Sequence, residues 1–102
     1  MQRFYAEDVV VFENRALARA GKQQCIDYEK EQQSRARSPA SLRALKRACN
    51  ETTGVSFVEW LIRFETEGGR PMRLEEVAVQ TWRDGAIAEE RFYYEGMVDE
   101  GD

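Results

Sequence analysis

Apolar and polar positions alternate over most of the second half of the chain, which is typical of strands that bury one face. The alternation predicts four strands, over residues 42–50, 55–67, 70–83 and 86–95. Gly68-Gly69 and Asp84-Gly85 divide the last three of them. Asp-Gly favours a hairpin because both central residues of a type I′ turn need a positive φ. We therefore expect a meander of four antiparallel strands, followed by an acidic, frayed tail from Gly96.

The first half of the chain has a different pattern. Residues 9–13 are β-branched or aromatic up to a final glutamate, which favours a strand. Residues 2–8 are expected to be the last turns of a helix, and residues 14–20 an irregular stretch. The lysine, glutamine and glutamate content of residues 22–36 predicts a helix with a narrow apolar stripe, ended by Ser38-Pro39. Residues 1–102 should thus form one α+β domain, with the helix on the concave side of a curved antiparallel sheet.

Two-residue loops at both hairpins would fix the strand register and the two faces of the sheet. Thr81 would then pair with Ala88, and Val79 with Glu90. The apolar face, expected to pack on the helix, would carry Val58, Trp60, Ile62, Phe64, Val77, Val79, Thr81, Ala88 and Phe92. The other face would mix aromatic and charged residues, namely Phe57, Glu59, Leu61, Arg63, Glu76, Ala78, Gln80, Trp82, Glu89, Arg91 and Tyr93.

The mixed face is too apolar for a simple solvated surface, and it favours contact between two copies of the chain. A two-fold axis would let one patch complement itself. We therefore expect a homodimer whose interface contains Phe57, Leu61, Arg63, Trp82, Arg91 and Tyr93.

Glu90 is unusual because it places a carboxylate at the centre of the apolar face. Two interpretations remain open. In the first, the explanation is structural: either a bulge shifts the strand register, or a neighbouring tyrosine or arginine binds the Glu90 carboxylate. In the second, Glu90 is a desolvated carboxylate in a cavity, an environment that suits acid–base chemistry near neutral pH. A buried carboxylate is costly, so its presence needs one of these explanations.

Composition narrows the kinds of site that are expected. The 102 residues are 42% hydrophobic and 33% charged, as in a globular domain. There is no histidine, which excludes Ser-His and Cys-His nucleophile pairs and the usual zinc sites. The net charge of −4 and the scattered basic residues argue against a nucleic-acid partner. No segment is apolar enough to cross a bilayer, and no secretion signal is recognisable, so we expect a cytoplasmic location without membrane contact.

Two cysteines, Cys25 and Cys49, have neither a CxxC partner nor a histidine nearby in the sequence. We expect them to be reduced, partly buried thiols rather than a disulfide or a metal site. No metal or cofactor is expected anywhere in the chain.

Three segments together resemble the SnoaL-like branch of the nuclear transport factor 2-like superfamily. They are residues 5–13 (Tyr-Ala-Glu-Asp-Val-Val-Val-Phe-Glu), Gly21-Lys22, and residues 75–94 with a tryptophan before Asp-Gly and a closing Arg-Phe-Tyr-Tyr. The resemblance implies a cone-shaped α+β barrel, with a strongly bent sheet around helices and a pocket on the concave side. It also implies homodimers that commonly pack through the outer sheet face.

Members of this superfamily usually carry one or two helices before the first strand, and only residues 2–7 stand there in this sequence. The chain is expected to be either a short member or one that starts after its natural beginning. SnoaL-type cyclases have a histidine and an aspartate two residues apart in the last strand. Glu90 and Phe92 occupy these positions here, so that cyclase chemistry is not expected.

Ketosteroid isomerases place a general-base aspartate at the end of the first strand, and Glu13 occupies that position. The resemblance implies a domain that binds a small apolar or carbonyl-containing ligand, with Glu13 and Glu90 as acid–base residues. Tyr5, Tyr28 or Tyr94 would donate a hydrogen bond to the oxyanion. The pocket would be lined by Tyr28, Val58, Trp60, Phe64, Val79, Phe92 and Tyr94. The alternative is a non-catalytic dimeric module whose pocket is filled by its own side chains.

Overall fold

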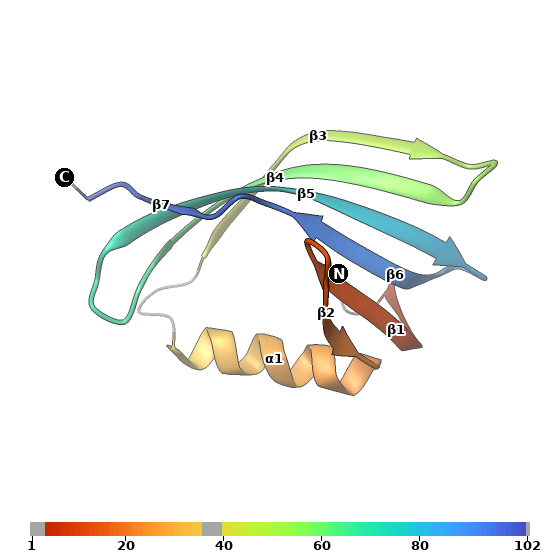
Figure 1. Ribbon diagram of the computed structural model, residues 1–102, viewed down its shortest axis with the longest axis horizontal. Helices are drawn as coiled ribbons and strands as arrows, with labels where there is room; N and C mark the ends of the chain where they lie inside the picture. Colours follow the sequence, from red (N-terminus) through yellow and green to blue (C-terminus); the bar gives the residue numbers. More distant parts are fainter. Residues whose placement is uncertain (1–3, 36–39, 102) are drawn as a thin grey trace.

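The computed structural model describes residues 4–35 and 40–101 of the chain. The elements follow one another as β1 (Tyr5–Glu13), β2 (Ala16–Ala20), α1 (Lys22–Arg35), β3 (Ser41–Asn50), β4 (Val55–Glu65), β5 (Pro71–Arg83), β6 (Ala86–Tyr93) and β7 (Met97–Asp99). The strands form a single strongly curved, open sheet, and α1 lies below its concave side (Figure 1). The expected α+β arrangement, with one helix on one side of a bent sheet, is confirmed.

The order of strands across the sheet is β2-β1-β6-β5-β4-β3. Neighbouring strands are antiparallel except for β1 and β6, which are parallel. The long strand β5 pairs along its second half with β6, while Met72–Leu74 pair with β7. The parallel pair was not expected from the sequence. It places the end of β1, with Glu13, beside the end of β6, with Phe92, and both are expected site residues.

Several elements differ from those predicted by the sequence pattern. The strand β1 already begins at Tyr5, so the expected helical turns over residues 2–8 are wrong for the part that the structure describes. The stretch predicted to be irregular contains β2, joined to β1 by a tight turn in which Asn14 has a φ of 55°. Asparagine tolerates this left-handed conformation better than most residues do. The tail forms the short strand β7. The expected helix end at Ala36 and Ser38-Pro39 lies outside the described residues.

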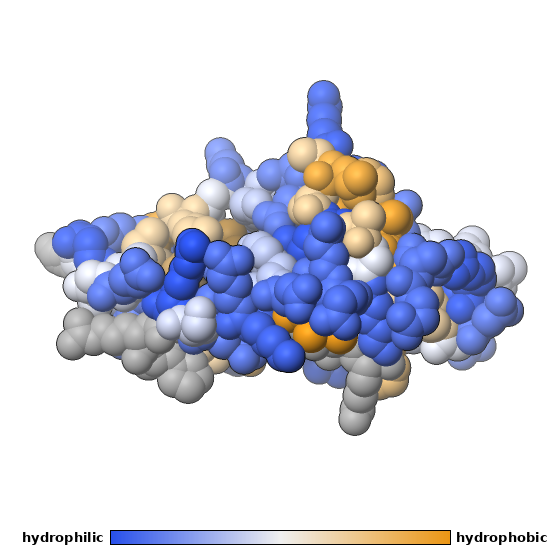
Figure 2. Space-filling view, turned by 90° about the horizontal axis from the view of Figure 1, so that it is seen from below, coloured by the Kyte–Doolittle hydropathy of each residue, from blue (hydrophilic) through white to orange (hydrophobic). Residues whose placement is uncertain are grey.

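The buried apolar core is small and lies where α1 covers β1 and β6. It consists of Val9, Val11, Cys25 and Ile87, with Tyr5, Trp82 and Phe92 packed against it. Cys25 is the residue of α1 that is buried, because the rest of this helix is strongly polar. The side of the molecule where α1 lies is accordingly mostly hydrophilic (Figure 2). No helix in the described residues is long and apolar enough to cross a membrane.

The register of the hairpins corrects the predicted faces. Glu65 pairs with Pro71, so the β4–β5 connection is a five-residue loop and not the expected two-residue turn. The β5–β6 hairpin does turn tightly at Asp84-Gly85, but a bulge between Thr81 and Trp82 shifts the pairs farther from the turn by one residue. Because a shift of one residue reverses which side chains face the core, Glu76, Ala78 and Gln80 point to the concave side.

The residues with which they alternate, Val77, Val79 and Thr81, lie on the outer face instead. Val79 pairs with Phe57 and Arg91, which were both expected on the outer face. Val79 was expected to line the pocket on the concave side, and this expectation is wrong because Val79 lies on the outer face. The physical reason is that the two shifts bring polar residues of three strands into one row, Ser56–Gln80–Glu90, where they can bond to each other.

Candidate active site

Three carboxylates share the concave side of the sheet, namely Glu13 at the end of β1, Glu76 in β5 and Glu90 in β6. The parallel pairing of β1 with β6 aligns Glu13 with Phe92 and Val11 with Glu90. Glu76 is close enough to both other carboxylates for their charges to affect its pKa. No group of three or more His, Cys, Asp or Glu side chains among the described residues is arranged to hold a metal ion.

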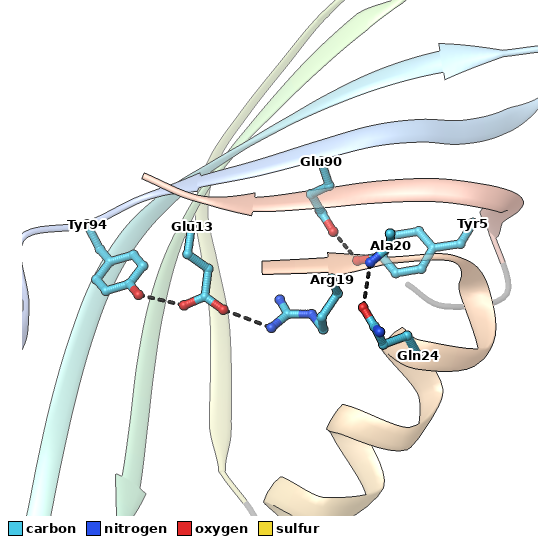
Figure 3. A network of polar contacts seen from close by, with 7 residues as sticks. All are labelled: Tyr5, Glu13, Arg19, Ala20, Gln24, Glu90 and Tyr94. Carbon is cyan, nitrogen blue, oxygen red and sulfur yellow. Dashed lines mark hydrogen bonds and ion pairs between the residues drawn. The ribbon is translucent and has the colours of Figure 1, made fainter. Parts of the chain in front are cut away.

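Glu90 is 1% exposed, which confirms that it is buried on the concave side. The Tyr5 hydroxyl donates to Oε1 of Glu90 (Figure 3). The Gln80 amide Nε2 donates to Oε2 over 2.7 Å. Burial raises the pKa of Tyr5 well above its ordinary value, and the Glu90 charge adds to this effect, so Tyr5 stays a donor. Both oxygens of Glu90 thus have a donor, and the tyrosine expected as one explanation for its burial is present.

Gln80 is as deeply buried as Glu90 and connects it to two further residues. The Ser56 hydroxyl donates to Oε1 of Gln80 over 2.7 Å, and the Trp82 indole Nε1 donates to the Ser56 oxygen over 2.9 Å. Trp82 therefore lies on the same side as Gln80 and Ser56. The expectation that Trp82 lies on the outer face is wrong, because the observed register places Trp82 on the concave side of the sheet.

Glu13 is bound by two donors from different segments. The Arg19 guanidinium donates to Oε2 over 2.8 Å, and the Tyr94 hydroxyl donates to Oε1 over 2.6 Å (Figure 3). Burial by itself would raise the pKa of Glu13, but the hydrogen bonds from Tyr94 and Arg19 and the Arg19 charge lower it below its ordinary value. Arg19 also stacks on the Tyr28 ring of α1, with its Cζ 3.9 Å from the ring centre. Glu13 is therefore held as a charged carboxylate.

Glu76 is the carboxylate of the three that no donor binds among the described residues. It is half-buried and lies opposite Trp60 where β4 and β5 pair. Burial, and after it the charges of Glu90 and Glu13, raise the pKa of Glu76 to about 7, although Arg19 acts in the opposite direction. Such a group is about half protonated at neutral pH and can both accept and release a proton. It is the group of this cluster best suited to proton transfer.

No protein-family model and no curated protein matches the sequence. Solved structures do match the fold. A candidate polyketide cyclase from Xanthomonas campestris pv. campestris is 23% identical with a TM-score of 0.79, over 93% of this chain and 76% of that chain. A candidate SnoaL-like polyketide cyclase from Jannaschia sp. CCS1 is 13% identical with a TM-score of 0.78, over 92% and 69% of the two chains.

A third structure, from Catenulispora acidiphila DSM 44928, has a ketosteroid isomerase-like fold and was determined in complex with trimethylamine. It is 13% identical with a TM-score of 0.78, over 91% of this chain and 71% of that chain. This chain has the SnoaL-like, ketosteroid isomerase-like fold. The resemblance expected from the sequence is confirmed for the fold.

Within the SnoaL-like fold, most residues expected around the pocket share the concave face with Glu90. Pairing and alternation place Val58, Trp60, Phe64 and Phe92 on that face. Tyr94 and Tyr28 reach the cluster through Glu13 and Arg19. Of the outer-face residues, Phe57, Leu61, Arg63, Arg91 and Tyr93 lie where they were expected, and Trp82 does not.

Three residues of the cluster were missed from the sequence. Arg19 was missed because residues 14–20 were predicted to be irregular, whereas they contain β2. Glu76 and Gln80 were missed because the predicted register of β5 differs from the observed one by one residue. A signal was available in the strands. A buried Glu90 needs donors, and Gln80 can supply one whereas Val79 cannot.

Two hollows in the surface lie away from the carboxylates. One, of about 260 Å³, is lined by Arg73, Glu75, Glu95, Gly96 and Val98. The other, of about 250 Å³, lies at the β3–β4 turn and is lined by Cys49, Asn50, Glu51, Gly54, Val55, Ser56 and Trp82. The second hollow therefore borders the outer end of the hydrogen bonds that lead to Glu90.

Proposed function

We propose that this chain is a small-molecule-binding domain that moves a proton on an apolar, carbonyl-containing ligand, with Glu76 as the acid–base residue. The observation that supports this best is a half-buried carboxylate without a bound donor, whose pKa of about 7 suits proton transfer near neutral pH. The SnoaL-like fold is consistent with this function, since the structures that it matches include candidate cyclases.

The other two carboxylates have different roles in this proposal. Glu13 is neutralised by Arg19, and Glu90 accepts hydrogen bonds from Tyr5 and Gln80. Each of them is already committed to donors, so neither is free to take a proton from a ligand without losing a bond. After burial, which has the larger effect, their charges make Glu76 a stronger base than an ordinary glutamate, because a like charge nearby disfavours loss of its proton.

The proposed step begins with the Glu76 carboxylate taking a proton from the carbon beside a ligand carbonyl. The electron pair of that C–H bond forms the enolate, whose oxygen needs a hydrogen-bond donor. Tyr5 and Tyr94 already donate to carboxylates, which leaves Tyr28, whose hydroxyl binds none of the described residues. Return of the proton from Glu76 to a different carbon gives an isomer. Trp60 and Phe92 on the same face would contact the apolar part of the ligand.

Exchange of carbon-bound hydrogen for deuterium tests this proposal. A panel of cyclic ketones and 1,3-diketones is incubated with the protein in D2O, and the loss of the α-proton signal is followed by NMR. We expect exchange faster than in buffer, with a rate that rises as the pH passes about 7. Glu76→Gln should abolish the increase. Glu75→Gln, which alters the exposed neighbouring carboxylate on the outer face, is the matched control and should retain it.

A second candidate function is a non-catalytic module. It is supported by Glu90, both of whose oxygens are bound by side chains of the protein itself. In that case none of the ketones would exchange faster than in buffer, and none would shift the NMR resonances of the concave face.

A further inference from the structure

A row of side chains connects the end of β5 to the buried Glu90 by hydrogen bonds that all point in one direction. Trp82 donates to Ser56, Ser56 donates to Gln80, and Gln80 donates to Glu90, over 2.9, 2.7 and 2.7 Å. The row crosses three strands, with Ser56 in β4, Gln80 and Trp82 in β5, and Glu90 in β6. It ends on the carboxylate that also receives the Tyr5 hydroxyl.

The direction of the row follows from the chemistry of its first member. An indole N–H can only donate, so the Ser56 oxygen must accept at that end. The single hydroxyl hydrogen of Ser56 is then free to bind the Gln80 carbonyl oxygen. With its oxygen engaged, the Gln80 amide must turn its NH2 group toward Glu90. Trp82 thus supports, three hydrogen bonds away, the orientation in which the Gln80 amide presents its NH2 group to Glu90.

Trp82 is itself held firmly by the β3–β4 turn. Its backbone N–H donates to the Gly54 carbonyl over 2.8 Å. Gly54 has a φ of +72°, and a Cβ at this position would lie 3.3 Å from the Trp82 carbonyl oxygen. The Phe4 ring packs against the indole with the ring centres 6.1 Å apart. The donor at the start of the row is therefore fixed in place by its surroundings.

We propose that Trp82 and Ser56 are positioning residues of the acid–base site, which hold the Gln80 amide with its NH2 group toward Glu90 and so fix the Glu90 carboxyl group in place near Glu76. The inference rests on the proposed function for the role that it gives to Glu76. Neither residue touches the reacting atoms. They act through Gln80, whose amide orientation they determine.

The consequence should be measurable at Glu76. Burial raises the pKa of Glu76 most, and the charges of Glu90 and Glu13, which face it, raise it further. The charge of Arg19, which also faces it, lowers this pKa. Tyr94 is also within electrostatic reach of Glu76. Without the Ser56 hydroxyl, the Gln80 amide is free to rotate and turn its carbonyl oxygen toward Glu90. Glu90 then loses its donor at Oε2 and its carboxyl group is no longer held in place, so its contribution to the raised pKa of Glu76 becomes smaller.

The experiment is a titration of the Glu76 carboxyl by carbon-13 NMR in the full chain. We expect the pKa of Glu76 to be lower in Ser56→Ala and in Trp82→Phe than in the native protein, moving from about 7 toward its ordinary value of 4.5. Ser56→Thr keeps the hydroxyl and should restore the native titration. An unchanged pKa in a folded Ser56→Ala protein would overturn the proposal, as would a Ser56→Thr protein that behaves like Ser56→Ala.

A second measurement covers the case in which Ser56→Ala or Trp82→Phe does not fold. Replacing Glu90 by Gln removes the charge at the inner end of the row, and it should displace the indole N–H resonance of Trp82 by cooperative polarisation. A stationary Trp82 resonance would overturn the proposal. Neither readout needs a ligand, so a protein without exchange activity that gives these results rejects the proposed function alone.

Discussion

Glu76 lies directly opposite Trp60 where β4 and β5 pair, so a carboxylate with a pKa of about 7 stands beside a large aromatic side chain of the concave face. An apolar neighbour withholds water from the charged form of the carboxylate and favours the protonated form. The neighbour of Glu76 in the sequence, Glu75, lies on the outer face and is exposed. One residue of register therefore decides which of two adjacent glutamates is available for acid–base chemistry.

Glu76 should make the stability of the protein depend on pH. Its pKa is raised in the folded state, so the folded protein holds a proton that the unfolded chain releases between about pH 4.5 and 7. The stability that protonated Glu76 contributes is fully present below about pH 4.5 and is lost as the pH rises to about 7. We expect Glu76→Gln to stabilise the protein by about 1–2 kcal/mol at pH 8, allowing for solvent screening of the half-buried side chain, and to be neutral at pH 4.

Denaturant unfolding at the two pH values measures this difference. Glu75→Gln is the matched control and should leave the free energy of unfolding nearly unchanged at both. Equal effects of the two substitutions at pH 8 would show that the environment of Glu76 is not as described.

Removal of the Gln80 amide should destabilise the fold. Gln80→Leu keeps a side chain of similar size but leaves Oε2 of Glu90 without its buried donor. We expect a loss of about 2–3 kcal/mol in the free energy of unfolding at pH 7, since the donor binds a buried charged group. Thr81→Val, at the exposed neighbouring position on the outer face, should change stability by less than about 0.5 kcal/mol. A neutral Gln80→Leu would contradict the role of this amide.

Tyr94 should contribute to stability through Glu13, and only while Glu13 is charged. Tyr94→Phe removes the donor to Oε1 and should raise the pKa of Glu13 toward its ordinary value. Because the pKa of Glu13 is lowered in the folded state, this contribution is present above the unfolded value and disappears as the pH falls through the folded one. We expect a cost of about 1 kcal/mol at pH 7 that vanishes in acid.

Tyr93→Phe provides the control for this prediction, because it removes a tyrosine hydroxyl from the outer face, away from Glu13, and keeps the aromatic ring. Its unfolding curve should coincide with that of the native protein at both pH values. A cost of Tyr94→Phe that persists in acid would mean that the hydroxyl acts on something other than the Glu13 charge.

We propose that the outer face of the sheet forms the homodimer interface expected from the sequence. Phe57 and Tyr93 on this face are 44% and 50% exposed, and Val77 adds to the apolar surface. Sedimentation at micromolar concentration should give a dimer, and Phe57→Glu should give a monomer, because it places a charge in the apolar patch. Leu42→Glu is the control, since Leu42 is more exposed but pairs with Ile62 on the concave side. A native monomer would refute the interface.

The sequence by itself determined the class of the fold and most of its strands. Asp84-Gly85 predicted a tight turn that the structure contains, because few dipeptides adopt two successive left-handed conformations easily; both residues have a positive φ. The alternation in residues 86–93 predicted that Glu90, and not Glu89, is buried, and it is. The polar composition of residues 22–35 was sufficient to predict α1, since helix propensity and a narrow apolar stripe are local properties.

The tertiary structure alone decided the register and, with it, the site. A five-residue β4–β5 loop and a bulge in the β5–β6 pair each move the strands by one residue, and neither leaves a clear local mark in the sequence. The buried Glu90 fits the resulting register, because its oxygens meet Gln80 of β5 and Tyr5 of β1. The same holds for Arg19, which reaches Glu13 only because β2 folds back along β1. Alternation is a property of each strand, whereas the face of the sheet that a side chain occupies depends on how the strands align, which is settled by long-range polar contacts.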